Sequence, residues 1–594
     1  MFKKFIACLL ALAMIFGLAA CGTVPAGTGG STAAPAEETE KEAEPAAEEA
    51  EPAEAGEISH DEEYDVEMFN TYANYMGDME GWFGKILKDR LNMKINIIAP
   101  NVAGTGDQLY QTRSAAGNLG DIIVQTKARM IDCYNAGLLG SMSPYLPNCP
   151  NLQKLEFAYE TFRETMGTDE VYAIPGRVSN NDATKAAGRG VNVEAGIFLR
   201  WDAYLKAGAP KLATIDDLVP LLYKMQDENP TNTNGEKVYA FSLFGDWDGS
   251  TVRGSREMMY LYGYSGYQGY YWGTPDGSEI VNLLDDDSLY YKWLKIYNQA
   301  YRDGYLDPDS ATQPWDTIAT KAKEGRVLFS WWTFLGRNIY SSGYDPAQYG
   351  FGFVPTDDVL ICNAGYNRYG AEGNAFAIGV GAKYPERLME FLDFYASEEG
   401  VLLSNSQVEG VTYELVDGHP VLTEFGLDTS DEKMAPESMG GGKWNDGACK
   451  INYPLVHADD PNSLIGGEPV TSSLWKSTLE NGRNEYTNKW EELYGVYSPL
   501  EYLESRGQLA VAPGIDYSAP ADPSDIATAR AQLSTLTKNA GWQMVYAESD
   551  EEFQSIWEDM KAQLDDFGYQ EVCEYDMAIV QDMIAARRRA LGLE

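Results

Sequence analysis

The chain has 594 residues, and its 45 basic and 90 acidic side chains give a formal charge of −45 at pH 7. Nucleic acids and anionic headgroups are bound through basic patches, so this charge argues against both as partners. It also disfavours a strongly anionic ligand, unless a basic cluster such as Arg587, Arg588 and Arg589 lies near the site, and we expect that cluster to lie elsewhere. The length and an apolar content of 44% favour two or more lobes.

The first residues form an export signal. Lys3 and Lys4 precede an apolar run over residues 5–20, which is shorter than the roughly 20 residues of a membrane-spanning helix. The sequence LAAC (18–21) resembles the bacterial lipobox, whose cysteine receives a diacylglycerol after cleavage. We expect a lipoprotein signal peptide over residues 1–20, with Cys21 acylated and anchored to the outer face of the cell membrane. The alternative is an ordinary signal peptide that ends in a cysteine by chance.

A spacer follows the signal. Residues 22–57 are almost entirely Ala, Pro, Gly, Thr, Ser and Glu. Such a segment buries too little apolar surface to offset its chain entropy, and its like charges extend it. We therefore expect residues 21–60 to be a disordered acidic spacer on the anchor.

Cysteine and histidine usage indicates neither a cofactor nor a metal. After processing, five cysteines remain, an odd number without a C-x-x-C spacing: Cys133, Cys149, Cys362, Cys449 and Cys573. A bridge between Cys133 and Cys149 is left open. The three histidines are scattered through the chain, which gives little support to a zinc site or a Ser-His-Asp triad.

The chain after residue 64 alternates strand-like and helical segments. Strands are expected at 65–72, 93–99 and 121–124, with helices at 82–91 and 107–116 between them. A second unit begins near residue 190, with strands at 191–199, 238–244 and 327–332 and with helices that start at Asp202, after Thr214 and at Leu289. Thr214 and Asp217 resemble a capping box. Pro385 suits the first position of a further helix, and helices at 553–564 and 572–591 close the chain. This order predicts parallel sheets covered by helices in two lobes.

Several segments resemble the extracellular solute-binding lipoproteins of ABC importers, specifically carbohydrate-type family 1 and its long lipoprotein branch. In chain order these segments are GNLGDIIV (117–124), FLRWDAYLKAGAPKLATIDDLVPLLYKM (198–225), WLKIYNQAYRDGYLDPDSATQ (293–313), AKEGRVLFSWW (322–332), AIGVGAKYPERLMEFLDFYASEEG (377–400), EGVTYEL (409–415) and FQSIWEDMKAQLDDFGYQEVCEYD (553–576).

The resemblance implies a periplasmic-binding-protein-like fold. Each of two hinged α/β lobes would hold a mostly parallel sheet flanked by helices, with the ligand in the cleft between them. We expect lobe 1 to comprise residues 61–185 and 372–430, and lobe 2 residues 186–371 and 431–594. The implied function is capture of a carbohydrate, most simply an oligosaccharide, for delivery to ABC permease subunits, without a cofactor and without catalysis.

Candidate ligand-binding residues follow from the rule that open α/β sheets bind ligands beyond the carboxyl ends of their strands. This points to the loops after Tyr72, Val124, Phe244 and Leu328. A sugar needs aromatic platforms and planar polar side chains. The loops provide Asp246, Trp247, Asp248, Trp331 and Trp332, and the family resemblance implies that one of the last two stacks on the ligand. One of that pair must face the core if the strand alternates.

Further candidates carry aromatic or polar groups in the other predicted loops. They are Trp82, which follows the first strand; Gln125 and Arg129, where sugar-binding relatives often have an aromatic and an acid; Trp272 in a tyrosine-rich tract; and Trp444 with Asn445 in a glycine-rich loop. Helical spacing makes Trp82 equally suited to the core. A calcium loop near Asn229 is disfavoured, because Val238 and Tyr239 stand where acidic ligands would.

Two other functions fit parts of the pattern. A surface glycoside hydrolase or lyase would also carry loop aromatics and paired carboxylates, but no catalytic motif is recognisable. A binding protein for a peptide or polyamine would use acidic loop residues with aromatics to enclose a cation. The ordered segments favour the carbohydrate importer over both.

Overall fold

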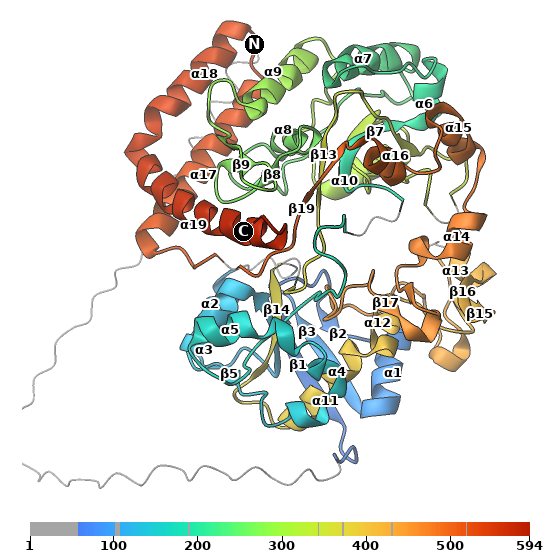
Figure 1. Ribbon diagram of the computed structural model, residues 1–594, viewed down its shortest axis with the longest axis vertical. Helices are drawn as coiled ribbons and strands as arrows, with labels where there is room; N and C mark the ends of the chain where they lie inside the picture. The colour runs from blue at the N-terminus through green and yellow to red at the C-terminus, as the bar shows by residue number, and fades with distance from the viewer. Residues whose placement is uncertain are drawn as a thin grey trace, which may run out of the picture. The chain divides into compact units, whose positions relative to one another are not determined.

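Three parallel strands organise the first lobe. The computed structural model describes residues 58–593 except 101, 103–106, 188–190, 342–343, 371–372, 429–431 and 518. Strand β1 (Tyr64–Asn70) lies between β3 (Met93–Ile98) and β4 (Ile122–Thr126), parallel to both, and β14 (Asn374–Gly379) pairs antiparallel with β4 (Figure 1). The sheet is completed by β2 (Gly77–Asp78), β5 (Leu139–Gly140) and β6 (Ile174–Pro175). The expected signal peptide, Cys21 and nearly all of the spacer lie outside the described residues.

Burial explains these strands. Met93, Ile95 and Ile97 of β3 are buried and alternate with more exposed residues, whereas residues 122–125 of β4 are all buried. Helices cover the sheet: α1 (Gly81–Leu91), α2 (Asp107–Ala115), α3 (Lys127–Asn135), α4 (Pro150–Gln153), α5 (Glu160–Met166), α11 (Pro385–Ala396) and α12 (Glu398–Ser404). Pro385 occupies the first turn of α11, as predicted. The strand-helix order expected for this lobe is confirmed.

The second lobe is built around strand β7 (Ala195–Arg200). All six of its residues are buried, between β11 (Phe329–Trp332) and β12 (Phe351–Phe353). Both neighbours run antiparallel to β7, and the parallel pair of Tyr239 with Val327 is an isolated bridge outside the named strands. The two-lobe α/β architecture is therefore confirmed, but the sheet around β7 is antiparallel, not mostly parallel as expected. The sequence could not predict this, because apolar periodicity marks a buried strand without giving its direction.

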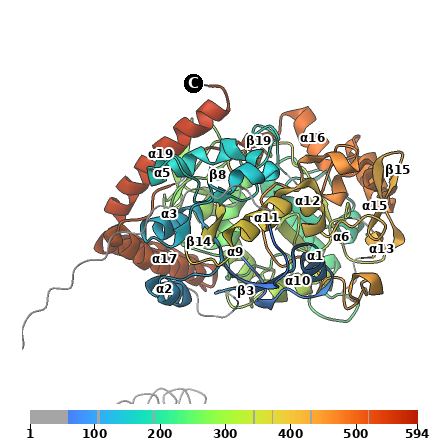
Figure 2. The same ribbon diagram turned by 90° about the horizontal axis from the view of Figure 1, so that it is seen from below.

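Helices surround the second core. The capping box at Thr214 is confirmed, since its backbone N–H donates to Asp217 Oδ2 at 2.9 Å. The helices are α6 (Trp201–Lys206), α7 (Leu218–Glu228), α8 (Arg253–Arg256), α9 (Leu289–Arg302), α10 (Trp315–Lys323), α15 (Glu485–Tyr494), α16 (Pro499–Arg506), α17 (Ser524–Val545), α18 (Asp550–Gln563) and α19 (Tyr569–Ala590). Figure 2 shows α17 and α19 along one edge of the molecule.

Two strands near the chain crossings join distant parts of the sequence. Strand β13 (Ile361–Ala364) leads toward the first lobe and pairs in parallel with β19 (Leu509–Ala512). The chain also crosses between the lobes after Val178, which forms an isolated bridge with Val456. A three-stranded sheet of β8 (Ser265–Gly266), β9 (Tyr271–Gly273) and β10 (Ile280–Asn282) lies in the second lobe. Strands β8, β13 and β19 contribute residues to the wall of a pocket.

Residues 432–456 differ from the expected division. They were assigned to lobe 2, but Ala435, Trp444, Ile451 and Leu455 pack into the core of the first lobe. A small third core of Val401, Leu402, Tyr413, Ile465, Val470 and Trp475 follows beside α12. The remaining elements of this region are β15 (Tyr413–Val416), β16 (His419–Leu422), α13 (Glu424–Leu427), β17 (Pro461–Asn462), β18 (Glu468–Pro469) and α14 (Lys476–Asn481).

The structure answers two questions that the sequence leaves open, namely whether Cys133 pairs with Cys149 and whether the loop near Asn229 binds calcium. Cys133 and Cys149 are separate free thiols, and Cys133 lies beside the Tyr110 hydroxyl at 3.6 Å. In the loop near Asn229, Asn229 Oδ1 accepts a hydrogen bond from Lys206 Nζ at 3.0 Å. A positively charged ammonium therefore lies beside an oxygen that a calcium site would use. Within the described residues, no His, Cys, Asp and Glu side chains gather into a group that could hold a metal.

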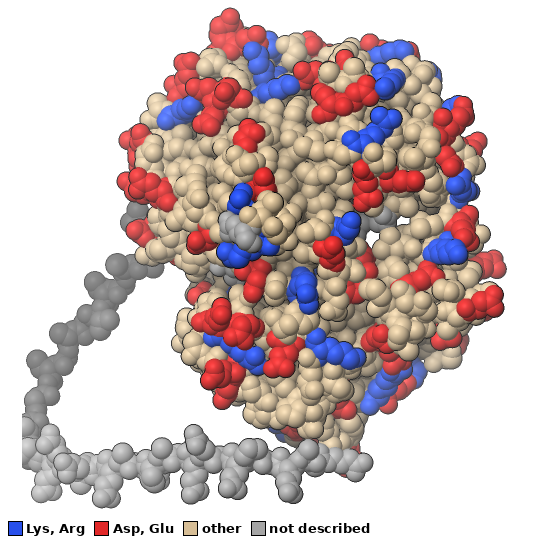
Figure 3. Space-filling view, in the orientation of Figure 1, with Lys and Arg blue, Asp and Glu red and all other residues tan. Residues whose placement is uncertain are grey.

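Charged side chains are spread over the surface and do not form one large patch on the face in Figure 3. On the face in Figure 3, acidic side chains are spread over the molecule with lysines and arginines between them. No helix among the described residues has the length and apolar character to span a membrane.

Candidate functional site

The loop before α8, the start of α10 and the end of β11 bring five aromatic side chains together. We call Phe244, Trp247, Trp315, Trp332 and Phe334 the aromatic patch. Trp247 stacks on Trp315 with a centroid distance of 4.8 Å, and Trp332 stacks on Phe334 at 4.9 Å. Trp332 is also 5.8 Å from Trp247, which joins the two stacks. Trp247 is 41% exposed, whereas Trp332 is 5% exposed.

Two carboxylates hold the loop that carries Trp247. Asp246 Oδ2 accepts from the backbone N–H of Trp315 at 2.8 Å. Asp248 is buried, and its Oδ1 accepts from the N–H of Arg253 at 2.9 Å while its Oδ2 accepts from Trp542 Nε1 at 2.6 Å. Burial raises the pKa of Asp248, and these hydrogen bonds oppose that rise. In this structure, both predicted carboxylates therefore position the aromatic loop.

The rings of Trp331 and Trp332 lie 5.2 Å apart, where the register of β11 shifts after Ser330, but their polar neighbours differ. Trp331 is 2% exposed and donates from Nε1 to Glu257 Oε2 at 3.0 Å, so it belongs to the core. The Arg253 guanidinium lies 4.8 Å from the Trp332 ring centroid and donates from Nε to Glu257 Oε1 at 2.6 Å. Burial raises the pKa of Glu257, and the two neighbouring arginines counteract that effect. Glu257 thus links the core tryptophan to the aromatic patch.

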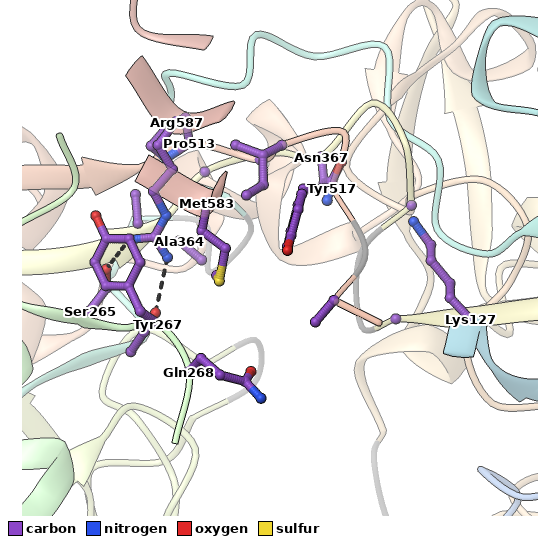
Figure 4. Close-up of a pocket in the computed structure, with 18 of the residues that line it drawn as sticks. Lys127, Ser265, Tyr267, Gln268, Ala364, Asn367, Pro513, Tyr517, Met583 and Arg587 are labelled. Atoms are coloured by element: carbon purple, nitrogen blue, oxygen red, sulfur yellow. Dashed lines mark hydrogen bonds between the residues drawn. The ribbon is translucent and has the colours of Figure 1, made fainter. Parts of the chain in front are cut away.

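A pocket of about 770 Å³ lies between the lobes. The first lobe contributes Thr126, Lys127 and Ala128, where β4 ends and α3 begins. The second lobe contributes Tyr260 and the segment 265–268, and α19 adds Met583 and Arg587. Further walls come from residues of the β13–β14 connection and from the segment after β19, including Asn367 and Tyr517. Figure 4 shows Lys127 on one side of the opening and Arg587 on the other.

Buried amides lie at one end of the first-lobe sheet, where β1 and β4 end and the antiparallel strand β14 begins. Asn70, Gln125 and Asn374 are fully buried, and each has at least one side-chain nitrogen or oxygen without a hydrogen-bond partner among the described residues. Asn374 pairs with Thr126 across β14 and β4, directly beside the pocket. Unsatisfied buried amides cost free energy, so this end of the sheet has polar capacity that the protein itself does not use.

The other predicted residues lie away from the pocket wall. Trp82 is fully buried and stacks on Trp444 at 4.5 Å in the first core. Trp272 is 5% exposed and packs behind the wall, edge-on to Tyr260. The Arg129 guanidinium lies 4.4 Å from the Tyr110 ring centroid. Exposed Asn445 accepts a hydrogen bond from Lys450 through its backbone carbonyl at 2.8 Å.

Sequence reasoning missed most of the pocket residues. Lys127 follows the predicted loop residue Gln125 by two positions, so the strand-end rule located its neighbourhood but not the residue. Tyr267 and Gln268 lie in the tyrosine-rich tract, where only Trp272 was selected. Arg587 was expected to lie away from the site, yet it lines the pocket. No local pattern marks a helix near the C-terminus as a wall of a pocket between lobes.

Comparisons with solved structures identify the fold. A Bifidobacterium longum infantis HMO-binding ABC-transporter associated solute-binding protein matches with a TM-score of 0.58 and 16% identity, over 89% of this chain and all of that one. The Streptococcus pneumoniae ABC-transporter substrate-binding protein FusA, in complex with kestose, matches with a TM-score of 0.58 and 14% identity, over 88% and 99%. The alginate-binding protein AlgQ2 matches with a TM-score of 0.56 and 16% identity, over 89% and 98%. The chain thus has the two-lobe fold of these solute-binding proteins.

Sequence comparison gives a distant relative among curated proteins. Lipoprotein LipO of Bacillus subtilis is 20% identical over 444 residues, which cover 72% of this chain and 75% of that protein. No protein-family model matches the sequence.

Proposed function

We propose that the protein is an extracytoplasmic substrate-binding lipoprotein that captures a carbohydrate between its lobes and presents it to an ABC permease. The observation that carries this proposal is the pocket between the lobes, whose walls come from both of them. A ligand that touches both lobes stabilises the arrangement in which they are close, and a permease can recognise that arrangement.

The lining chemistry suits an oligosaccharide. Tyrosines and amide side chains line the pocket, so hydroxyl groups find donors and acceptors together with apolar ring faces. The aromatic patch supplies flat surfaces for C–H faces of further sugar units, with Trp247 the most exposed of its tryptophans. The matched solute-binding proteins named for HMO and alginate and the complex with kestose support the same ligand class.

The first test is thermal unfolding of the chain from residue 58 onward with oligosaccharides, monosaccharides, peptides and polyamines. A ligand at a hundred times its Kd should stabilise the protein by about 2.7 kcal/mol. We expect an oligosaccharide to raise Tm and to be recovered chemically intact. Cleavage of the sugar would establish an enzyme, and stabilisation by peptides or polyamines alone would overturn the carbohydrate assignment.

Replacement of Trp247 tests the aromatic patch. Trp247→Ala should raise the Kd for that oligosaccharide by about tenfold, because it removes one exposed ring of the stack, whereas Trp247→Phe should change it by less than about threefold. Titration calorimetry measures both variants. Equal affinity in Trp247→Ala and the unchanged protein would exclude the patch from the binding site.

The lipid anchor is a separate part of the proposal. In a lipoprotein-processing bacterial host, the full chain should fractionate with membranes and carry a diacylglycerol on Cys21 by mass spectrometry. Cys21→Ser should be recovered without the lipid and away from the membrane. Membrane association of Cys21→Ser equal to that of the unchanged chain would contradict lipidation at this position.

A further inference from the structure

The charges around the pocket between the lobes differ from those of the whole chain. The chain has twice as many acidic as basic side chains. Among the described residues that line the pocket, however, the charged side chains are Lys127 and Arg587, and none is an aspartate or glutamate. The local field of this pocket therefore favours an anion, although the protein as a whole is strongly negative.

Arg587 is a buried cation without an ion-pair partner among the described residues. It is 7% exposed and lines the pocket from α19. Its Nη1 donates to Ser265 Oγ at 2.8 Å and its Nη2 to the Gly266 carbonyl at 3.0 Å, while Nε has no partner. The guanidinium stacks on Tyr267, 3.9 Å from the ring centroid. Neutral acceptors fix its position, and its charge remains uncompensated.

A half-buried arginine on the neighbouring helix, by contrast, has carboxylate partners. Arg530 of α17 donates to Asp576 at 2.7 Å and to Asp522 at 2.6 Å. Arg587 lies on the neighbouring helix α19 and has no carboxylate within ion-pair distance among the described residues. An anionic ligand in the pocket could therefore supply the negative charge that Arg587 lacks.

Lys127 provides the second cation, from the first lobe. Its Nζ donates to the Tyr369 carbonyl at 2.6 Å and forms no ion pair with a described residue. Burial lowers the pKa of Lys127 to about 8, and the nearby carboxylate of Asp516 opposes that effect without reaching ion-pair distance. Lys127 also begins α3, so the positive end of a helix dipole lies beside it.

We propose that the glycan bound between the lobes carries anionic groups, carboxylates or sulfates, which face Lys127 on one side of the pocket and Arg587 on the other. This inference rests on the proposed function and specifies its substrate class. Each lobe contributes one cation, so an anionic ligand favours the arrangement in which both lobes contact it. Gln268, Asn367 and Tyr517, which also line the pocket, are available for neutral hydroxyl groups.

The test uses three sets of oligosaccharides of equal length in titration calorimetry. One set contains uronic acids, the second contains the same sugars with their carboxylates reduced to primary alcohols, and the third contains sulfated neutral sugars. We expect a uronate or a sulfated sugar to bind, and the uncharged counterpart to bind at least tenfold more weakly, which is about 1.4 kcal/mol. Comparison of the first and third sets distinguishes carboxylate from sulfate.

Four variants, one of them a control, test where the anion binds. Lys127→Gln should weaken binding of the charged sugar about tenfold and alter binding of its uncharged counterpart by less than about twofold. Arg587→Gln should have an equal or larger effect, with Arg587→Lys retaining part of the affinity. Arg589→Gln removes the same charge from an exposed position of the same helix and should leave affinity unchanged. Because Lys127 is only partly enclosed, its variant remains informative if Arg587→Gln does not fold.

The possible results separate this inference from the proposed function. Equal binding of charged and uncharged sugars, or an unchanged affinity in Lys127→Gln, would overturn the anionic site and leave carbohydrate capture standing. If no sugar of any set binds, while a peptide or polyamine does, both proposals are wrong.

Discussion

Replacing Trp82 with alanine is expected to lower the free energy of unfolding by about 3–5 kcal/mol, with little effect on ligand affinity. Trp82 is fully buried, stacks on Trp444 and donates from Nε1 to the Trp444 carbonyl at 2.9 Å. The substitution leaves a cavity and an unpaired carbonyl where two distant parts of the first lobe meet. Denaturant unfolding of the first lobe measures this loss of unfolding free energy.

Trp247→Ala is the matched control, because the same chemical change is made at a tryptophan that is 41% exposed. Its effect on stability should be smaller than that of Trp82→Ala, since the Trp247 ring is partly exposed and its ring contacts are with other residues of the aromatic patch. The two variants should therefore have opposite consequences, with Trp82 affecting stability and Trp247 affecting affinity. Unchanged stability together with weakened binding in Trp82→Ala would instead place Trp82 in the ligand site.

Replacing Asp307 with alanine is expected to cost about 3–5 kcal/mol in the second lobe. Asp307 is fully buried, and its Oδ2 accepts hydrogen bonds from Lys321 Nζ and Ser242 Oγ, each at 2.7 Å. Without this carboxylate, the ammonium of Lys321 stays buried and keeps only Asp309, whose side chain is 65% exposed. Calorimetric unfolding measures the effect.

Two further variants test the cause of this loss. Asp307→Ala combined with Lys321→Met should recover part of the stability, because the double variant removes the unpaired charge. Asp216→Ala breaks an exposed pair with Lys292 and should cost less than about 1 kcal/mol. A double variant as unstable as Asp307→Ala alone would show that lost packing and hydrogen bonds, not the buried charge, dominate.

Local chemistry made much of the fold predictable. Thr214 caps its helix and Pro385 opens another because both effects depend on a few neighbouring residues. Strand direction in the second lobe was not predictable, because β7 is buried on both sides and its apolar run is the same in either orientation. The assignment of residues 432–456 also failed, since the contact of Trp444 with Trp82 joins positions 362 residues apart.

The sequence predicted which loops lie near the site, but it did not predict which side chains contact one another there. The strand-end rule selected the neighbourhood of Thr126 and the loop that carries Trp247, and the structure places the former beside the pocket and the latter in the aromatic patch. Whether a tryptophan faces solvent or core depends on its partners, so Trp247 and Trp82 look alike in sequence. Arg587 lies far from every other pocket segment in the chain, and only folding brings it there.

The hydrogen bond between Arg587 and Ser265 spans 322 residues, and it closes the pocket with the last helix of the chain. Every other wall segment precedes α19 in the chain, so during synthesis the pocket is completed only after α19 has folded. A chain that stops early or loses its last helix to a protease therefore lacks one of the two cations.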